Sequence, residues 1–140
     1  MGEAFSVNID GGARGNPGPA GWGVVVYNAA GDVIAELSGT LPHATNNVAE
    51  YQGLLAALTW CLDHGAASVH VKSDSLLLVQ QMRGVYKVKN EGLKSLHGQA
   101  RLLASRIGRV TFEHVRRELN KDADRLANFA MDEAENAAKA

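Results

Sequence analysis

The order of strand-like and helix-like segments is the feature that most constrains how this chain folds, and it begins with three strands in succession. Residues 4–10 alternate between polar and apolar side chains, and residues 22–28 and 33–39 also have strand composition. Only the turn sequence Ala30-Gly31-Asp32 lies between the second and third segments, which predicts an antiparallel hairpin. Residues 11–21, rich in glycine and proline, predict a loop after the first strand.

Helices and strands alternate in the rest of the chain. The predicted helices cover 48–62, 75–82, 92–107 and 121–136, and the remaining strands cover 67–73 and 110–115. This order predicts an α/β fold, a mixed five-stranded sheet with three antiparallel strands, then two parallel ones, flanked by helices. Asn46, Asn47 and Asn120 are expected as helix caps, and residues 137–140 are expected to fray. A length of 140 residues without a linker or repeat predicts a single domain over 1–140.

Composition excludes several classes of protein. Apolar residues make up 46% of the chain, but no apolar run is long enough for a transmembrane helix, and no secretory signal is expected. The lone Cys61 excludes an intramolecular disulfide framework and a cysteine zinc cluster, and a thiol in the middle of an apolar helix is expected in the core. These features favour a cytoplasmic monomer with no evident protein partner and no membrane association.

Charge is distributed unevenly along the chain. The net charge is −1, but twelve of the fourteen Lys and Arg residues lie within 66–125. Such asymmetry can mark a basic binding face, although charge alone favours ordinary solvated helix faces. Lys87 and Lys89 lie just after Tyr86, in the stretch that pairs an aromatic side chain with closely spaced cations, and are the candidate phosphate contacts there.

Four acidic residues stand out by their placement. Asp10 ends the first predicted strand, Asp74 ends the fourth, Glu50 lies within a mostly apolar helix, and Asp124 lies near the start of the last helix. Each has a plainer explanation: a turn residue for Asp10, an N-cap for Asp74, a surface ion pair for Glu50, a favourable helix-dipole charge for Asp124. However, the first and fourth strands are neighbours in the predicted sheet, which would bring Asp10 and Asp74 together under the first helix.

Clustered carboxylates indicate a metal site of a particular kind. Oxygen ligands suit Mg²⁺ or Mn²⁺ rather than zinc, and two such ions can activate water and stabilise the leaving oxygen of a phosphodiester. Other chemistries have less support. Ala13 interrupts a dinucleotide-type glycine pattern, and no phosphate-cradling lysine motif occurs. His114 shares a strand face with Val110 and Phe112 and is expected to be a packed or structural histidine. His43, His64, His70 and His97 lack the spacing of metal ligands.

Four motifs together resemble those of type 1 ribonucleases H, in the compact form found in bacteria and archaea. They are the segment from Asp10 to Gly23 (DGGARGNPGPAGWG), residues 45–50 (TNNVAE), residues 73–75 (SDS) and residues 120–127 (NKDADRLA). The resemblance covers nearly the whole chain in order and spacing. It implies a ribonuclease H-like fold and a two-metal endonuclease that cuts the RNA strand of RNA–DNA hybrids, leaving 5′-phosphate and 3′-hydroxyl ends.

The resemblance also implies roles for individual residues. Asp10, Glu50, Asp74 and Asp124 would be the catalytic metal ligands. Asn16, Asn46 and Asn47 match positions that contact the minor groove of the hybrid, Thr45 matches a DNA-phosphate contact, and His43 lies where a basic neighbour of that contact is usual. Backbone amides at Gly11 and Gly12 suit the close approach of a strand whose 2′-hydroxyls must be sensed.

Three departures from the family pattern concern efficiency and substrate range. The segment 116–120 is short and lacks the histidine associated with product release, so Arg116 or Arg117 would substitute for it. Leu76 stands where a glutamine that touches RNA is common, and residues 83–95 are too few for a basic protrusion that binds DNA.

Alternative functions are a nuclease of the same fold acting on double-stranded RNA or another structured nucleic acid, and a catalytically weak binding module. Four anions placed beside a polyanion argue against the binding module.

Overall fold

A five-stranded mixed sheet forms the centre of the molecule in a computed structural model that describes residues 2–140. The strand order is β3-β2-β1-β4-β5. β1 pairs antiparallel with β2 and parallel with β4, while β2 pairs antiparallel with β3 and β4 parallel with β5. The strands are β1 Glu3–Ala13, β2 Gly18–Tyr27, β3 Val33–Ala44, β4 Ala66–Ser73 and β5 Arg109–His114. This arrangement confirms the fold predicted from the segment order.

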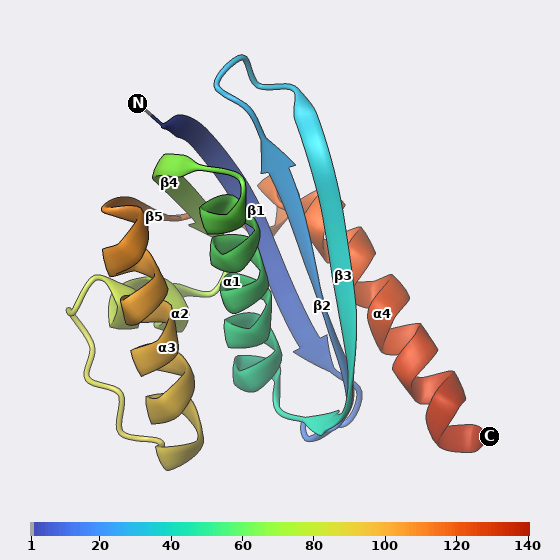
Figure 1. The fold of residues 1–140 in the computed structure, drawn as a ribbon. Coiled ribbons are helices and arrows are strands. Elements are labelled where there is room, and N and C mark those ends of the chain that lie inside the picture. The colour runs from blue at the N-terminus through green and yellow to red at the C-terminus, as the bar shows by residue number, and fades with distance from the viewer. Residues whose placement is uncertain (1) are drawn as a thin grey trace.

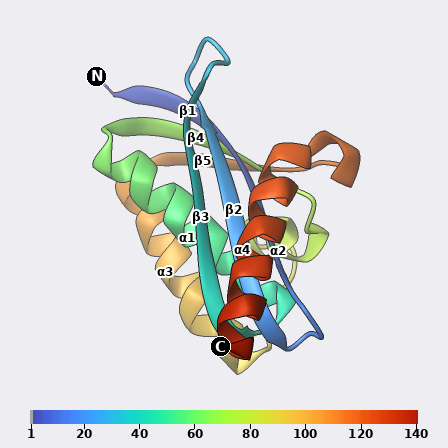
Figure 2. The same cartoon turned by 90° about the vertical axis from the view of Figure 1, so that its right-hand side faces the viewer.

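Helices cover the two faces of the sheet unequally. The helices are α1 Asn46–Asp63, α2 Leu76–Met82, α3 Glu91–Ile107 and α4 Lys121–Lys139, preceded by the 3₁₀ turn η1 Arg117–Leu119. α1 and α3 lie on one face, and α4 crosses the other face over β2 and β3 (Figures 1 and 2). The main core lies between the sheet and α1, where Ile9, Val24 and Leu58 are fully buried. Cys61 belongs to this core, as expected, and burial raises the pKa of its thiol to about 12.

The residues predicted as a loop after the first strand are mostly strand. β1 continues to Ala13 and β2 begins at Gly18, with Gly11 opposite Trp22 and Gly12 opposite Gly21. Gly21 in this segment is needed for packing rather than for a turn. A Cβ at Gly21 would lie 2.6 Å from the backbone nitrogen of Met131 in α4, and one at Gly23 would lie 2.5 Å from the carbonyl oxygen of Ala123, so this helix can approach the sheet only where side chains are absent.

Helix ends differ from expectation in three places. Thr45 caps α1, because its hydroxyl accepts a hydrogen bond from the Val48 amide, whereas Asn46 is already the first helical residue. Asn120 precedes α4, but its side chain makes no capping hydrogen bond. Residues 137–139, expected to fray, continue α4 to Lys139. No helix in residues 2–140 is long and apolar enough to cross a membrane.

Candidate active site

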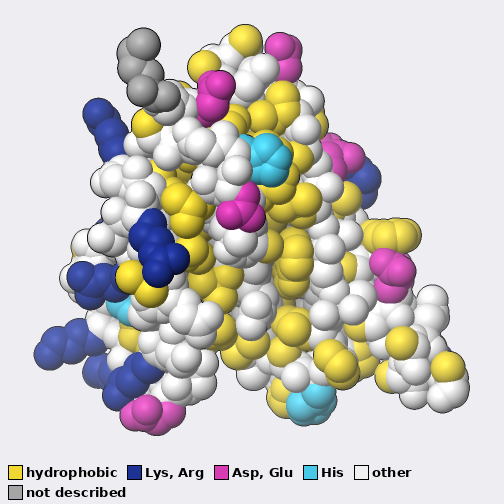
Figure 3. Space-filling view, in the orientation of Figure 1, with side chains coloured by type: hydrophobic (Ala, Val, Ile, Leu, Met, Phe, Trp, Pro, Cys, Tyr) yellow, Lys and Arg dark blue, Asp and Glu magenta, His cyan; other side chains and the backbone are white. Residues whose placement is uncertain are grey.

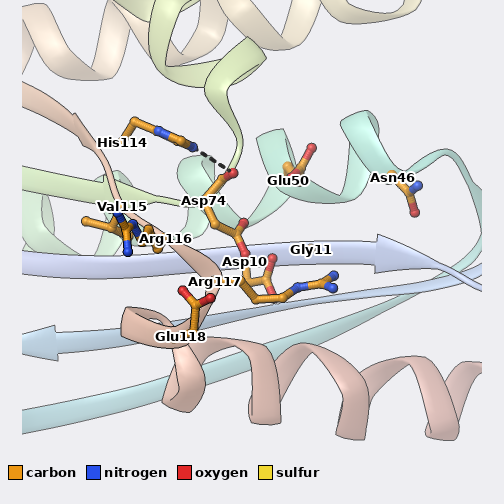
Figure 4. A pocket seen from close by; sticks show the side chains of 10 residues that line it. All are labelled: Asp10, Gly11, Asn46, Glu50, Asp74, His114, Val115, Arg116, Arg117 and Glu118. Carbon is orange, nitrogen blue, oxygen red and sulfur yellow. Dashed lines mark hydrogen bonds between the residues drawn. The ribbon is translucent and has the colours of Figure 1, made fainter.

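Three of the four predicted acids form one cluster. Asp10, Glu50 and Asp74 each offer a carboxylate oxygen, and these oxygens all lie within 4.8 Å of one another. Ile9 of β1 pairs with Ser73 of β4, so the residues that follow them, Asp10 and Asp74, lie side by side (Figure 4). Asp10 lies in the middle of β1 rather than at its end, because β1 continues past the cluster.

Glu50 reaches the cluster because α1 lies unusually close to β1. A Cβ at Gly11 would be only 2.5 Å from the backbone nitrogen of Glu50, so Gly11 allows the two backbones to approach. Asp74, in turn, is not the cap of α2. The hydroxyl of Ser75 accepts the hydrogen bond from the Leu78 amide, which frees the Asp74 carboxylate to face the cluster.

Asp124 lies beside the cluster rather than within it. It occupies the first turn of α4, and its side chain lies close enough to Asp10 to help raise the pKa of that carboxyl group. The three-residue metal-ligand group of residues 2–140 does not include it. The fourth acid therefore approaches the cluster from α4, whereas Glu50 approaches it from α1 on the other face of the sheet.

Burial and mutual repulsion make this cluster hard to ionise. Burial raises the pKa of Asp10 to about 8, and the charge of Asp74 and the hydrogen bond to Asp124 act in the same direction. Burial also raises the pKa of Glu50 to about 8, again with a contribution from Asp74. The pKa of Asp74 is raised by its own burial, although the nearby Arg117 opposes that shift. A divalent cation would relieve this repulsion.

The cluster opens into a cavity of about 590 Å³, called the acid cavity below. Its far wall is the segment after β5, and Figure 4 shows the Arg117 side chain extending alongside Asp10. The lining residues are Asp10, Gly11, Asn46, Glu50, Asp74, His114, Val115, Arg116, Arg117 and Glu118. Both arginines proposed as substitutes for the missing histidine therefore line the cavity that holds the acids.

His114 is not packed, which was one of the two roles predicted for it. Its side chain is exposed rather than packed with Val110 and Phe112, and its Nε2 lies 3.2 Å from the backbone oxygen of Asp74. Strand alternation puts it on the same face as Phe112, but it is the last residue of β5 and is exposed. Together with Glu118, His114 lines the acid cavity, and the sequence contained no spacing signal for either residue.

The residues expected to contact substrate gather near the start of α1. Asn46 lines the acid cavity, and its Oδ1 accepts a hydrogen bond from the amide of Ala13, while Asn16 Oδ1 accepts one from the Asn46 amide. These two bonds fasten the loop after β1 to the first turn of α1. Thr45 caps that turn, His43 is exposed at the end of β3, Asn47 is half-buried, and Gly12 lies against the side chain of Met131.

A second concave surface carries positive charge. Lys87 lines a groove of about 510 Å³ between α2, α3 and the segment that joins them, whereas Lys89 is exposed but does not line it. We call this surface the basic groove; its cationic lining residues are Arg83, Lys87, Lys94 and Arg101, together with His97. Lys and Arg side chains gather over this part of the molecule in Figure 3. The sequence predicted Lys87 as a phosphate contact but did not point to Arg83 or Arg101.

Comparison with known proteins agrees with this geometry. Residues 8–130 match the family model described as reverse transcriptase-like. The bifunctional protein Rv2228c of Mycobacterium tuberculosis is 50% identical over 135 residues, which are 96% of this chain and 37% of that protein. Ribonuclease HI of Halobacterium salinarum is 39% identical over 126 residues, which are 90% of this chain and 63% of the relative. The chain thus spans less than two thirds of the length of either curated relative.

Solved structures show the same similarity. The N-terminal RNase H domain of the Mycobacterium tuberculosis protein superposes with a TM-score of 0.94 at 48% identity, covering 97% of this chain and 99% of that one. LC11-RNase H1 in complex with an RNA/DNA hybrid superposes with a TM-score of 0.88 at 42% identity, covering 93% and 98%. With its sheet order, its acid cluster and these matches, the chain belongs to the reverse transcriptase-like family and forms a ribonuclease H-like domain.

Proposed function

We propose that this chain is a metal-dependent endonuclease that hydrolyses the RNA strand of RNA–DNA hybrids. The observation that carries the proposal is the convergence of Asp10, Glu50 and Asp74 in one open cavity, with Asp124 beside Asp10. The relatives support the choice of reaction and substrate, since one is named a ribonuclease HI and another was solved with an RNA/DNA hybrid.

The donor set fits hard divalent cations. All four side chains offer oxygen, and no cysteine or histidine belongs to the metal-ligand group of residues 2–140. We infer that Asp10, Glu50, Asp74 and Asp124 hold two Mg²⁺ or Mn²⁺ ions. When bound, such a pair supplies an activated water and stabilises the leaving oxygen, which leaves a 5′-phosphate and a 3′-hydroxyl. The raised pKa values of Asp10 and Glu50 support the need for added positive charge.

Other side chains around the cavity would bind and orient the substrate. Arg116 and Arg117 line the cavity opposite the acids, where a guanidinium can contact a phosphate through two hydrogen bonds. Asn46 at the near wall, with Asn16, Asn47, Thr45 and His43 beside it, would contact the hybrid backbone and minor groove, as would the amides of Gly11 and Gly12. Lys87 and Lys89 would contact phosphates beyond the reacting one.

Digestion of a panel of labelled substrates tests the proposal. The panel is an RNA–DNA hybrid, duplex DNA, duplex RNA and single strands of the same sequence, each with Mg²⁺, with Mn²⁺ and with EDTA. We expect cleavage of the RNA strand of the hybrid only with metal present. Cleavage that persists in EDTA would contradict the metal assignment, and stronger cleavage of duplex RNA would favour the alternative substrate.

The chemistry of the product ends tests the mechanism separately. A 5′-phosphate end is degraded by a 5′-phosphate-dependent exonuclease, and a 3′-hydroxyl end is extended by a polymerase. We expect both reactions to succeed on the RNA products. Products with a 2′,3′-cyclic or 3′-phosphate end would mean that the RNA 2′-hydroxyl attacks, which would overturn the water-attack mechanism while leaving the substrate assignment intact.

A further inference from the structure

One fully buried polar side chain lies where three parts of the acid site meet. Asn120 has an exposed fraction of 0%, and its Nδ2 donates a 2.9 Å hydrogen bond to the backbone oxygen of Ile9 in β1. Its Oδ1 is buried and has no hydrogen-bond partner among the described residues. Buried amides usually have all their polar atoms bonded, because an unpaired one costs free energy.

The backbone of Asn120 contacts the other two parts of the site. Its carbonyl oxygen accepts a hydrogen bond of 3.0 Å from the amide of Asp124, and its own amide donates one of 3.0 Å to the carbonyl oxygen of Arg117. Ile9, the partner of its side chain, directly precedes Asp10. Through these three bonds Asn120 joins the strand of Asp10, the helix of Asp124 and the turn of Arg117.

Ordinary structural reasons do not account for this side chain. Asn is a common helix cap, but the Asn120 side chain makes no capping bond to α4. An apolar residue would fill a buried position without leaving an oxygen unpaired. The carboxamide provides a directional hydrogen bond from the start of α4 to β1, which an apolar side chain cannot provide. This bond lies beside Asp10 of β1 and Asp124 of α4.

We infer that Asn120 is a positioning residue, whose bond to the Ile9 carbonyl sets the separation between Asp124 and Asp10. The inference rests on the proposed function in one respect, since it takes these acids to hold the cations. Without the link, the first turn of α4 can shift relative to β1. The carboxylate of Asp124 would then no longer approach the cluster correctly, although every acid would still be present.

Cation binding provides a readout that is independent of cleavage. The Mn²⁺ concentration that gives half of the maximal thermal stabilisation is measured for the wild type and Asn120→Ala. We expect this midpoint to rise about 10-fold in Asn120→Ala, the size of effect seen when a group that orients a ligand is removed. For hybrid cleavage we expect kcat to fall by up to about 10²-fold, while KM stays near the wild-type value.

Two further variants separate positioning from simple loss of stability. Tyr51→Phe removes another buried hydrogen bond, that from Tyr51 to Gln81 Oε1, and should lower the melting temperature while keeping the wild-type Mn²⁺ midpoint. Asn120→Thr fills more of the space than alanine but cannot reach the Ile9 carbonyl. It therefore reports on the missing bond if Asn120→Ala fails to fold, and its midpoint should also rise.

A double-mutant cycle tests whether Asn120 acts through Asp124. In an Asp124→Ala background, adding Asn120→Ala should produce no further change in the Mn²⁺ midpoint, because the group being positioned is gone. Additive effects, or a wild-type midpoint in both Asn120 variants, would overturn the inference alone. A wild type that Mn²⁺ does not stabilise at all would overturn the proposed metal site and this inference with it.

Discussion

The acid cavity and the basic groove differ in how their charged groups are held. The acids are wholly or partly buried. Asp10 lies in β1, Asp74 directly follows β4, Glu50 lies in α1 and Asp124 lies in the first turn of α4. The cations of the basic groove are exposed and lie around a connecting segment and on the outer surface of α3. Reacting groups benefit from a rigid scaffold, whereas phosphate binding needs charge nearby more than exact placement.

The comparison predicts different kinetic consequences for the two regions. Loss of a cavity acid should lower the rate at saturating substrate, and loss of a groove cation should weaken binding. It also predicts different responses to salt, because exposed charges are screened more strongly than buried ones.

Replacing Asp10 should have the largest effect. Asp10→Asn keeps the shape of the side chain and removes its charge, so the fold should remain while kcat for hybrid cleavage falls by at least about 10²–10³-fold. Cleavage rates with Mg²⁺ and with Mn²⁺ measure this, and circular dichroism checks the fold. The matched control is Asp63→Asn, an exposed acid at the end of α1, which should cleave normally. Wild-type kcat in Asp10→Asn would remove Asp10 from the reaction.

Replacing the two lysines should have a smaller effect, confined to binding. Lys87→Ala/Lys89→Ala should raise KM and leave kcat nearly unchanged. The slope of log affinity against log salt, expected to be about −2 to −5 in the wild type, should become shallower by up to about 1.8. Binding is measured in Ca²⁺ over a range of salt concentrations, with exposed Lys139→Ala as control. Unchanged slope and affinity would exclude this segment and leave Arg116 and Arg117 as the main phosphate contacts.

Stability without metal should depend on pH in a direction set by the acids. The pKa values of Asp10 and Glu50 rise from 3.8 and 4.5 to about 8 in the folded protein. Between about pH 4 and about pH 8 the folded state therefore binds more protons than the unfolded state. The free energy of unfolding should fall as the pH rises through this range. In EDTA at pH 8, Glu50→Gln should therefore melt at the same or a slightly higher temperature than the wild type, and its melting temperature should depend less on pH.

The exposed Glu133→Gln, which removes the same charge on α4, is the control for this measurement and should follow the pH dependence of the wild type. A clear loss of stability in Glu50→Gln would instead indicate that Glu50 stabilises the fold. That result would contradict the view that the buried carboxylates of the acid cavity destabilise the metal-free fold.

Strand order explains why part of the site was predictable. Three strands followed by two strand-helix units place the first and fourth strands side by side, so Asp10 and Asp74 follow from topology alone. Glu50 was noticeable because a carboxylate is unusual in an apolar helix. Asp124 was predicted from its placement and its motif. Its position beside Asp10, outside the three-acid cluster, depends on how closely α4 packs on the sheet. Contacts such as that between Ala123 and Gly23 set this distance.

The features that were missed depend on contacts between distant parts of the chain. Gly11 and Gly12 were predicted as loop residues because composition does not reveal that neighbouring helices require glycine there. His114 follows the alternation of a buried strand, but whether a strand end is covered depends on where the helices stop. Arg83 follows α2 and Arg101 lies on α3, so they line one groove only because α2 packs beside α3. The positioning role inferred for Asn120 could be recognised only once the structure had placed its side chain against the backbone of β1.

The acids come from four different elements, so no short segment of the chain can assemble the site by itself. Bringing them together requires the parallel pairing of β1 with β4 and the docking of both α1 and α4, contacts that join segments far apart in the sequence. A cation that needs all of them binds the native state and not a partly folded one. Physiological Mg²⁺ would then shift the folding equilibrium toward the native chain and reduce the openings through which proteases attack it.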